Sequence, residues 1–129
     1  MIPHITLVAA AVLGLLYVAL SVRVVSHRVK TKVLLGDGQN QGLSIAIRTH
    51  ANFSEYVPLA LILIGGVEVL GFPSLAVKVL SGVLVFARFV HVHGVATKGT
   101  AGHGRPVGTI FTWLVMTVSA VLILINGWL

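Results

Sequence analysis

Four apolar stretches, each long enough to cross a lipid bilayer, take up most of this 129-residue chain and leave little room for any other fold. A membrane-spanning helix needs about 20 predominantly apolar residues. The stretches cover residues 5–25, 43–70, 75–92 and 107–129. Charged residues make up 9% of the chain, against about 25% in an average soluble domain, and the mean hydropathy is +1.02. The sequence therefore predicts an all-α integral membrane protein, a single domain over residues 1–129 whose four helices run up-down-up-down.

The placement of the basic residues predicts how the helices are oriented. Most of the lysines and arginines flank the first and third connections: Arg23, Arg28, Lys30, Lys32, Lys98 and Arg105. The second connection, at residues 71–74, has only Lys78 nearby. Cytoplasmic loops carry an excess of Lys and Arg, so we expect residues 26–44 and 93–106 in the cytoplasm and both termini on the other side. Because these positive charges are explained by the orientation of the helices in the membrane, the net charge of +6 does not indicate a nucleic-acid partner.

The first stretch is expected to remain as a helix. It has no basic segment before it and leads directly into basic residues, unlike a cleaved signal peptide.

Three polar side chains interrupt the second apolar stretch. Arg48, Asn52 and Glu55 follow the spacing i, i+4 and i+7, which places them on one face of a helix. Ionisable groups at membrane depth usually face a bundle interior or a wet cavity, and they indicate a functional site. This helix is expected to begin near residues 41–44, with Ser44 as a candidate N-cap. Glu68, at its far end, is expected to be interfacial and structural.

Four arginines come from four helix ends on the predicted cytoplasmic side: Arg28, Arg48, Arg88 and Arg105. Arg88 and His91 are neighbours on one helical face, at i and i+3. The guanidinium group matches a carboxylate with two parallel hydrogen bonds, so this basic pocket favours an anion with several carboxylates. Glu55 could in addition bind an ammonium group. Glutathione is one ligand with all of these groups.

Several motifs in the chain carry a resemblance to a known family. RxxxNxxEYxP at residues 48–58 and ARxxHxxG at residues 87–94, with Arg105 before the last helix, resemble the MAPEG family of membrane-associated proteins in eicosanoid and glutathione metabolism. GDG, AIRTH and RPVGTIFTW are most similar to its small bacterial inner-membrane branch. The resemblance covers nearly the whole chain. It implies an inner-membrane homotrimer with periplasmic termini, which binds glutathione between subunits near the cytoplasmic helix ends.

The resemblance also implies roles for individual residues. Those matching positions that contact glutathione are Arg28, Arg48, His50, Asn52, Glu55, Tyr56 and Arg88. Arg105 is similar to the arginine that stabilises the glutathione thiolate, which makes it the implied catalytic residue. His91 and Val95 stand where several glutathione-binding members have tyrosines. His91 could replace one hydrogen bond to the ligand, whereas Val95 cannot donate any.

The implied activity is that of a glutathione transferase or peroxidase. An unperturbed thiol has a pKa of about 8.5, and a neighbouring guanidinium lowers that pKa by stabilising the charged form. The thiolate of glutathione, or of a related low-molecular-weight thiol, would attack a hydrophobic electrophile or a lipid hydroperoxide that enters from the bilayer.

Three alternatives remain open. The first is a non-catalytic member of the same family that binds a lipid or a partner protein, since fold does not fix function. The second is a small four-helix multidrug exporter, which needs a carboxylate within the first helix, where residues 5–25 have none. The third is haem or metal ligation by His50, His91 and His93, for which Glu55 is the one nearby carboxylate. The chain has no cysteine, which excludes thiolate metal sites and disulfides.

Overall fold

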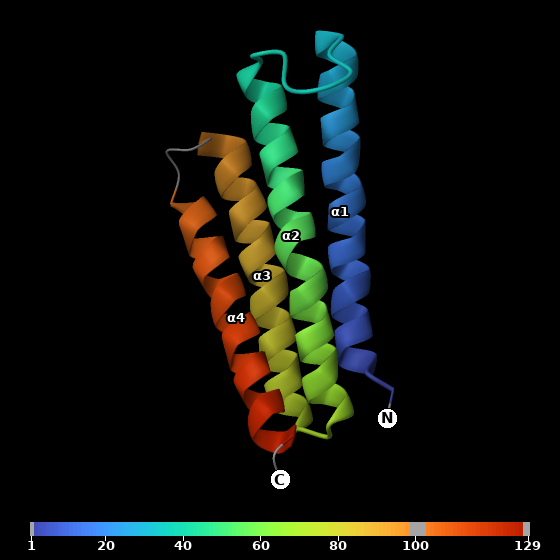
Figure 1. Ribbon diagram of the computed structural model, residues 1–129, viewed down its shortest axis with the longest axis vertical. Coiled ribbons are helices and arrows are strands. Elements are labelled where there is room, and N and C mark those ends of the chain that lie inside the picture. The colour runs from blue at the N-terminus through green and yellow to red at the C-terminus, as the bar shows by residue number, and fades with distance from the viewer. Residues whose placement is uncertain (1, 99–102, 128–129) are drawn as a thin grey trace.

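The computed structural model describes residues 2–98 and 103–127, and its regular structure consists of four long helices. They are α1 (His4–Thr31), α2 (Gln41–Val69), α3 (Ser74–Lys98) and α4 (Gly104–Gly127). The helices run alternately up and down, and both chain ends lie at the end of the bundle that holds the α2–α3 turn (Figure 1). Each helix is long and apolar enough to cross a membrane. The predicted all-α, four-helix, up-down-up-down fold is confirmed, whereas the homotrimer stays a prediction.

Each predicted stretch differs from its helix at one end or both, because hydropathy marks the membrane core and not the helix ends. α1 continues to Thr31 and α3 to Lys98, whereas the predicted stretches end at residues 25 and 92. α4 begins at Gly104, before the predicted residue 107, and the predicted residues 128–129 lie outside the described part. Polar residues that follow an apolar stretch can continue the same helix in water until a cap ends it.

Caps explain the two helix ends at the α1–α2 connection. Lys32 ends α1 in the left-handed conformation, with φ of 55°, and its backbone N–H donates to the Arg28 carbonyl. Asn40 is the N-cap of α2, and its side chain accepts a hydrogen bond of 2.9 Å from the backbone N–H of Leu43. The prediction of Ser44 as N-cap is therefore wrong. Asn is an equally favourable N-cap residue and occurs four positions earlier.

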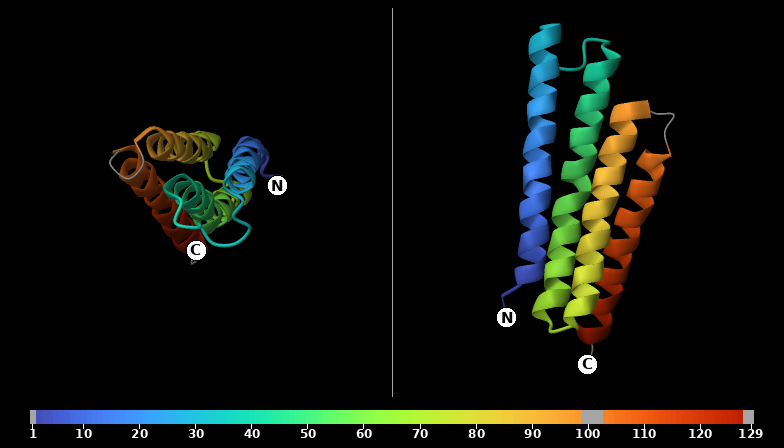
Figure 2. Two further views of the ribbon diagram at one scale, coloured as in Figure 1. Left: turned by 90° about the horizontal axis from the view of Figure 1, so that it is seen from above. Right: turned by 180° about the vertical axis from the view of Figure 1, so that it is seen from behind.

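α2 is the central helix of the bundle. It packs against α1, α3 and α4, whereas α1 and α4 do not touch each other within the described ranges. Seen along the bundle, α1 and α4 lie on opposite sides of α2 (Figure 2). The buried core draws on all four helices: Leu13, Leu20, Phe53, Ala60, Ile64, Leu84 and Val115. Polar residues of α2 can therefore face α1, α3 or α4, depending on their position around the helix.

α3 and α4 approach each other backbone to backbone at three glycines. A Cβ atom added to Gly94 would lie 2.6 Å from the Gly104 Cα, and one added to Gly108 would lie 2.5 Å from the Ala87 carbonyl oxygen and 2.6 Å from the His91 Cβ. Small residues permit such close packing between membrane helices. This contact holds the first turn of α4 against the part of α3 that carries His91.

The opposite end of the bundle is fixed by Glu68 of α2. Its carboxylate accepts hydrogen bonds from the backbone N–H groups of Ile5 and Thr6, both at 2.8 Å, and from the Thr6 hydroxyl at 2.6 Å. The N-cap position of α1 is Pro3, which makes no side-chain cap. Glu68 thus caps α1 from a neighbouring helix and has the structural role predicted for it.

Candidate functional site

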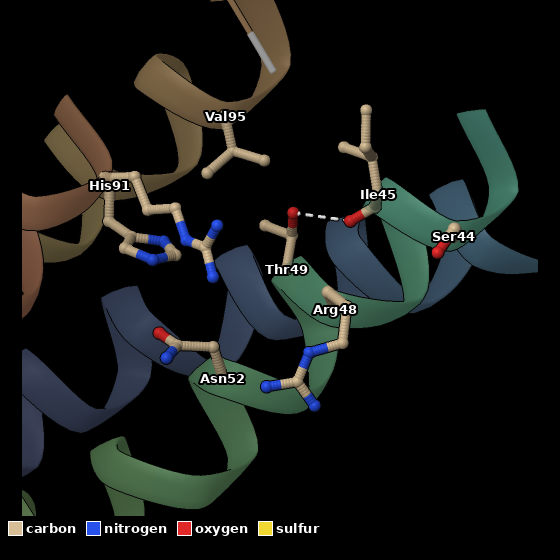
Figure 3. Close-up of a pocket in the computed structure, with 8 residues that line it drawn as sticks. Ser44, Ile45, Arg48, Thr49, Asn52, His91 and Val95 are labelled. Atoms are coloured by element: carbon tan, nitrogen blue, oxygen red, sulfur yellow. Dashed lines mark hydrogen bonds between the residues drawn. The ribbon is translucent and has the colours of Figure 1, made fainter. Parts of the chain in front are cut away.

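An open groove of about 630 Å³ lies between α2 and the first turns of α4. The residues that line it are Arg48, Asn52, Glu55, Tyr56, Arg105, Pro106, Thr109, Ile110 and Trp113. A smaller cavity of about 130 Å³ shares three of these residues and reaches inward to α3 (Figure 3). Its lining residues are Ser44, Ile45, Arg48, Thr49, Asn52, His91, Val95 and Arg105. The fold therefore brings two arginines, an amide and a carboxylate to one place.

The outer part of the groove carries an exposed ion pair. Arg48 Nη1 lies 3.7 Å from Glu55 Oε1, and the two side chains are 62% and 51% exposed. An exposed pair of this kind contributes at most about 1 kcal/mol to stability. In the same groove, the Tyr56 ring of α2 lies against the Trp113 ring of α4, with the ring centroids 6.3 Å apart. Arg48 and Glu55 thus remain available to a ligand at little cost to the fold.

The inner wall depends on a buried arginine. Arg88 is fully buried, and its Nη2 donates a hydrogen bond of 2.8 Å to Asn52 Oδ1. Its guanidinium also lies over the Phe53 ring, 5.4 Å from the centroid. Within the described residues Arg88 forms no ion pair with a carboxylate. Arginine can only donate, so the amide oxygen of Asn52 must face it, and the NH₂ group of Asn52 is the end left for a ligand.

His91 lies opposite Asn52 in the small cavity, with Val95 one turn further along α3 (Figure 3). Its Nδ1 lies 3.4 Å from Arg88 Nη2. Because the arginine donates, Nδ1 accepts and the ring proton is on Nε2. His91 Nε2, Arg88 Nε and Arg88 Nη1 are buried and have no hydrogen-bond partner in the described part of the chain. Buried polar atoms are normally paired. Of these two residues only His91 lines the small cavity, so its Nε2 is the atom that could donate to a bound group there.

Besides Arg88, two predicted site residues line neither cavity. His50 faces α1, where its Nε2 lies 3.0 Å from the Ser21 hydroxyl and its ring stacks on Tyr17 at 4.7 Å. His50 and His91 therefore lie on different sides of α2, and no group of three potential metal ligands is present among the described residues. The predicted contact of His50 with glutathione stays a prediction.

Arg28 is held by its own loop. Its Nη1 donates to the carbonyl oxygens of Val33, Leu34 and Gly36 at 3.2, 3.1 and 3.0 Å. These bonds fold the α1–α2 connection back onto the end of α1. Whether Arg28 also contacts a ligand bound between subunits stays a prediction.

Sequence analysis missed several lining residues that helical spacing could have revealed. Ser44 lies four residues before Arg48, while Thr109 and Trp113 lie four and eight residues after Arg105. Residues at these spacings share a helix face. The signal was therefore present once Arg48 and Arg105 had been selected.

The chain matches the MAPEG family over residues 6–125. It belongs to the MAPEG family. All of the site residues described above lie within the matched range, so the MAPEG resemblance seen in the motifs is confirmed.

Two bacterial relatives match at similar strength. Inner membrane protein YecN of Escherichia coli K12 is 31% identical over 119 residues, which cover 92% of this chain and 87% of the relative. Inner membrane protein YecN of Escherichia coli O6:H1 (strain CFT073) gives the same values. Together with the four apolar helices, these relatives support a multi-pass inner-membrane MAPEG protein.

Proposed function

We propose that this protein is a membrane-bound, glutathione transferase-like or peroxidase-like enzyme, with its groove open toward the cytoplasm. In this orientation, residues 26–44 and 93–106 are cytoplasmic and both termini are periplasmic. The observation that carries the proposal is the single groove lined by Arg48, Asn52, Glu55 and Arg105. Ionisable side chains are rare in membrane helices and usually mark a binding site.

The groups along the groove match those of glutathione. Glutathione has two carboxylates, one ammonium group and one thiol. Arg48 can bind a carboxylate in two parallel hydrogen bonds, Glu55 can bind the ammonium group, and Asn52 presents its NH₂ group. The 3.7 Å Arg48–Glu55 pair is weak enough to open for such a zwitterion. The same chemistry would bind a related low-molecular-weight thiol.

Arg105 is the proposed catalytic residue. Its guanidinium would stabilise the glutathione thiolate, and each unit by which the thiol pKa falls corresponds to about 1.4 kcal/mol. With a halogenated nitrobenzene, the thiolate sulfur forms a bond to the ring carbon and the halide leaves with the electron pair. With a lipid hydroperoxide, two glutathione molecules are oxidised to the disulfide, and the hydroperoxide is reduced to an alcohol and water.

A homotrimer with glutathione between its subunits completes the proposal. Arg48 and Glu55 are more than half exposed on the protomer although α2 crosses the membrane. Charged side chains at such depth avoid lipid, so a neighbouring subunit or the aqueous phase must cover them. Arg28 of a neighbour would contact the ligand by exchanging its loop carbonyls for a carboxylate.

Calorimetric titration of the purified protein in nanodiscs with glutathione tests the proposal. Arg48→Ala is expected to weaken binding about tenfold or more, whereas Arg105→Ala is expected to keep much of the binding. Turnover of the halogenated nitrobenzene should fall about 100-fold in Arg105→Ala, the usual effect of removing one group that stabilises developing negative charge. Arg23→Ala is the matched control, because Arg23 lines neither cavity.

Failure to bind glutathione would point to another role. If wild-type protein gave no binding heat, the enzyme proposal would be wrong. A non-catalytic MAPEG protein that binds a lipid or a partner protein would then take its place.

A further inference from the structure

A second groove of about 630 Å³ lies between α1 and α3 and shares no lining residue with the candidate site. Its walls are apolar and include Val8 and Val12 of α1 and Phe86 and Phe89 of α3. Two polar residues of α3, Lys78 and Ser81, lie at the end nearest the α2–α3 turn. The groove is therefore basic at the end nearest the α2–α3 turn and apolar along the rest of its length.

The length of this groove corresponds to one leaflet of a bilayer. Lys78 and Phe89 are eleven residues apart, which is about 16 Å along a helix. The hydrocarbon core of a membrane is about 30 Å thick, so the length of the groove is about half of that thickness. A single lipid acyl chain has this reach.

Lys78 has no counter-charge among the residues that the structure describes. No carboxylate lies within ion-pair distance of it in the described ranges. The carboxylate at this end of the bundle, Glu68, already accepts three hydrogen bonds from the start of α1. A lysine near a membrane interface attracts anionic lipid headgroups, so a phosphate would supply the missing charge.

Ser81 adds a second unpaired group one helical turn deeper. Its hydroxyl is buried and has no hydrogen-bond partner among the described residues. Three residues separate it from Lys78, which is about 4.5 Å along the helix. In a phospholipid the ester carbonyls lie directly below the phosphate, and the acyl chains follow. The groove presents its groups in the same order: first Lys78, then Ser81, then the apolar walls. Rotation of the Ser81 side chain would direct its hydroxyl at an ester carbonyl.

We propose that the α1–α3 groove binds one anionic diacyl phospholipid, with its phosphate on Lys78, an ester carbonyl on Ser81 and one acyl chain against Val8, Val12, Phe86 and Phe89. This site is independent of the proposed function. A second copy of the chain fits less well. The chain has only three acidic residues: Asp37 lies in the α1–α2 connection at the opposite end of the bundle, Glu55 lies midway along α2, and Glu68 is already engaged.

Native mass spectrometry of the detergent-purified protein tests the site with two defined lipids, dioleoyl phosphatidylglycerol and dioleoyl phosphatidylcholine. Wild-type protein should retain one phosphatidylglycerol per protomer and bind it about fivefold more tightly than phosphatidylcholine, the preference expected for one lysine. Lys78→Gln should abolish this preference. Lys30→Gln, which changes an exposed lysine outside the groove, should keep it.

Gly82→Leu fills the groove while leaving Lys78 in place. A Cβ on Gly82 would meet no atom within 4 Å, so the new side chain enters open space, and leucine favours the helix more than glycine does. Phosphatidylglycerol binding should fall at least tenfold. Gly14→Leu is the matched control, because a Cβ on Gly14 also meets no atom within 4 Å but Gly14 lies in a different groove.

Any one of the following results would overturn the proposal. The first is equal binding of the two lipids by wild-type protein. The second is wild-type lipid binding by Gly82→Leu. The third is a change of oligomeric mass in Gly82→Leu but not in Gly14→Leu, because that would make the groove a contact between copies. Should Gly82→Leu not fold, Lys78→Gln alone decides, and an unchanged lipid preference in that variant would overturn the site.

Discussion

Two buried charged side chains lie toward opposite ends of the bundle, and they differ in how completely their hydrogen bonds are satisfied. Glu68 accepts three hydrogen bonds of 2.6–2.8 Å from the first turn of α1. Arg88 is equally buried but donates one short bond, to Asn52, and its Nε and Nη1 have no partner among the described residues. The carboxylate is satisfied by its own chain, whereas the guanidinium is not.

This difference separates a structural role from a functional one. A buried group whose hydrogen bonds are all made within the chain stabilises the fold. Buried polar atoms that lack partners are uncommon, and departures from a fully satisfied interior are expected at functional sites. His91, which has an unpaired Nε2, lines the small cavity together with Arg48 and Arg105, and Arg88 contacts the Asn52 side chain of the same cavity. Glu68 therefore stabilises the bundle, whereas Arg88 supports the groove proposed to bind glutathione.

The largest expected effect comes from breaking the backbone contact that supports the site end. A Cβ at Gly108 would lie 2.5 Å from the Ala87 carbonyl oxygen, so Gly108→Ala must push α4 away from α3. We expect a loss of about 3 kcal/mol in the free energy of unfolding, at the upper end for overpacking, and weaker glutathione binding because Arg105 moves with α4. Gly14→Ala, in open space, should be neutral or slightly stabilising. Equal stability of the two variants in detergent unfolding titrations would contradict the close contact.

Glu68→Gln should have the next largest effect and act on the fold alone. Gln replaces one acceptor oxygen with an NH₂ group that faces donors at the start of α1, which should cost about 2 kcal/mol. Glu55→Gln is the control, because Glu55 is 51% exposed and its loss should cost less than about 1 kcal/mol. Glutathione affinity should respond in the opposite way, unchanged in Glu68→Gln and weaker in Glu55→Gln. If both variants changed stability alike, the contrast between the two ends would fail.

Much of the fold could be predicted because hydropathy reports directly on the membrane. Four apolar stretches gave the helix number, and the short connections gave the alternating order. The helix ends could not be predicted in this way, since they depend on local caps. Asn40 rather than Ser44 begins α2, because the Asn40 side chain is the one that reaches a free backbone N–H, that of Leu43.

The site was predicted in part, because residue spacing fixes a helix face but not the neighbour that the face meets. Arg48, Asn52 and Glu55 line one groove as their spacing indicates. The spacing did not reveal that Asn52 binds Arg88 or that His50 faces Ser21, since both contacts depend on how helices pack. The glycines that bring α4 close to α3 could not be recognised from the sequence either, because their role depends on how the two helices pack.

Arg88→Met should have the smallest effect on stability and is the sharpest test of the contrast. It removes a buried cation that has no carboxylate partner in the described part of the chain and replaces it with an apolar side chain of similar length. Removing the buried charge is favourable, whereas the Asn52 Oδ1 loses its hydrogen-bond donor. Because these two effects oppose each other, we expect a net change within about 1 kcal/mol. Glutathione affinity should nevertheless fall about tenfold, because the Asn52 amide loses the donor that orients it. Unfolding titration and calorimetry on the same preparation measure the two quantities. A stability loss as large as that of Glu68→Gln, with unchanged affinity, would make Arg88 a structural residue and remove the distinction between the two ends.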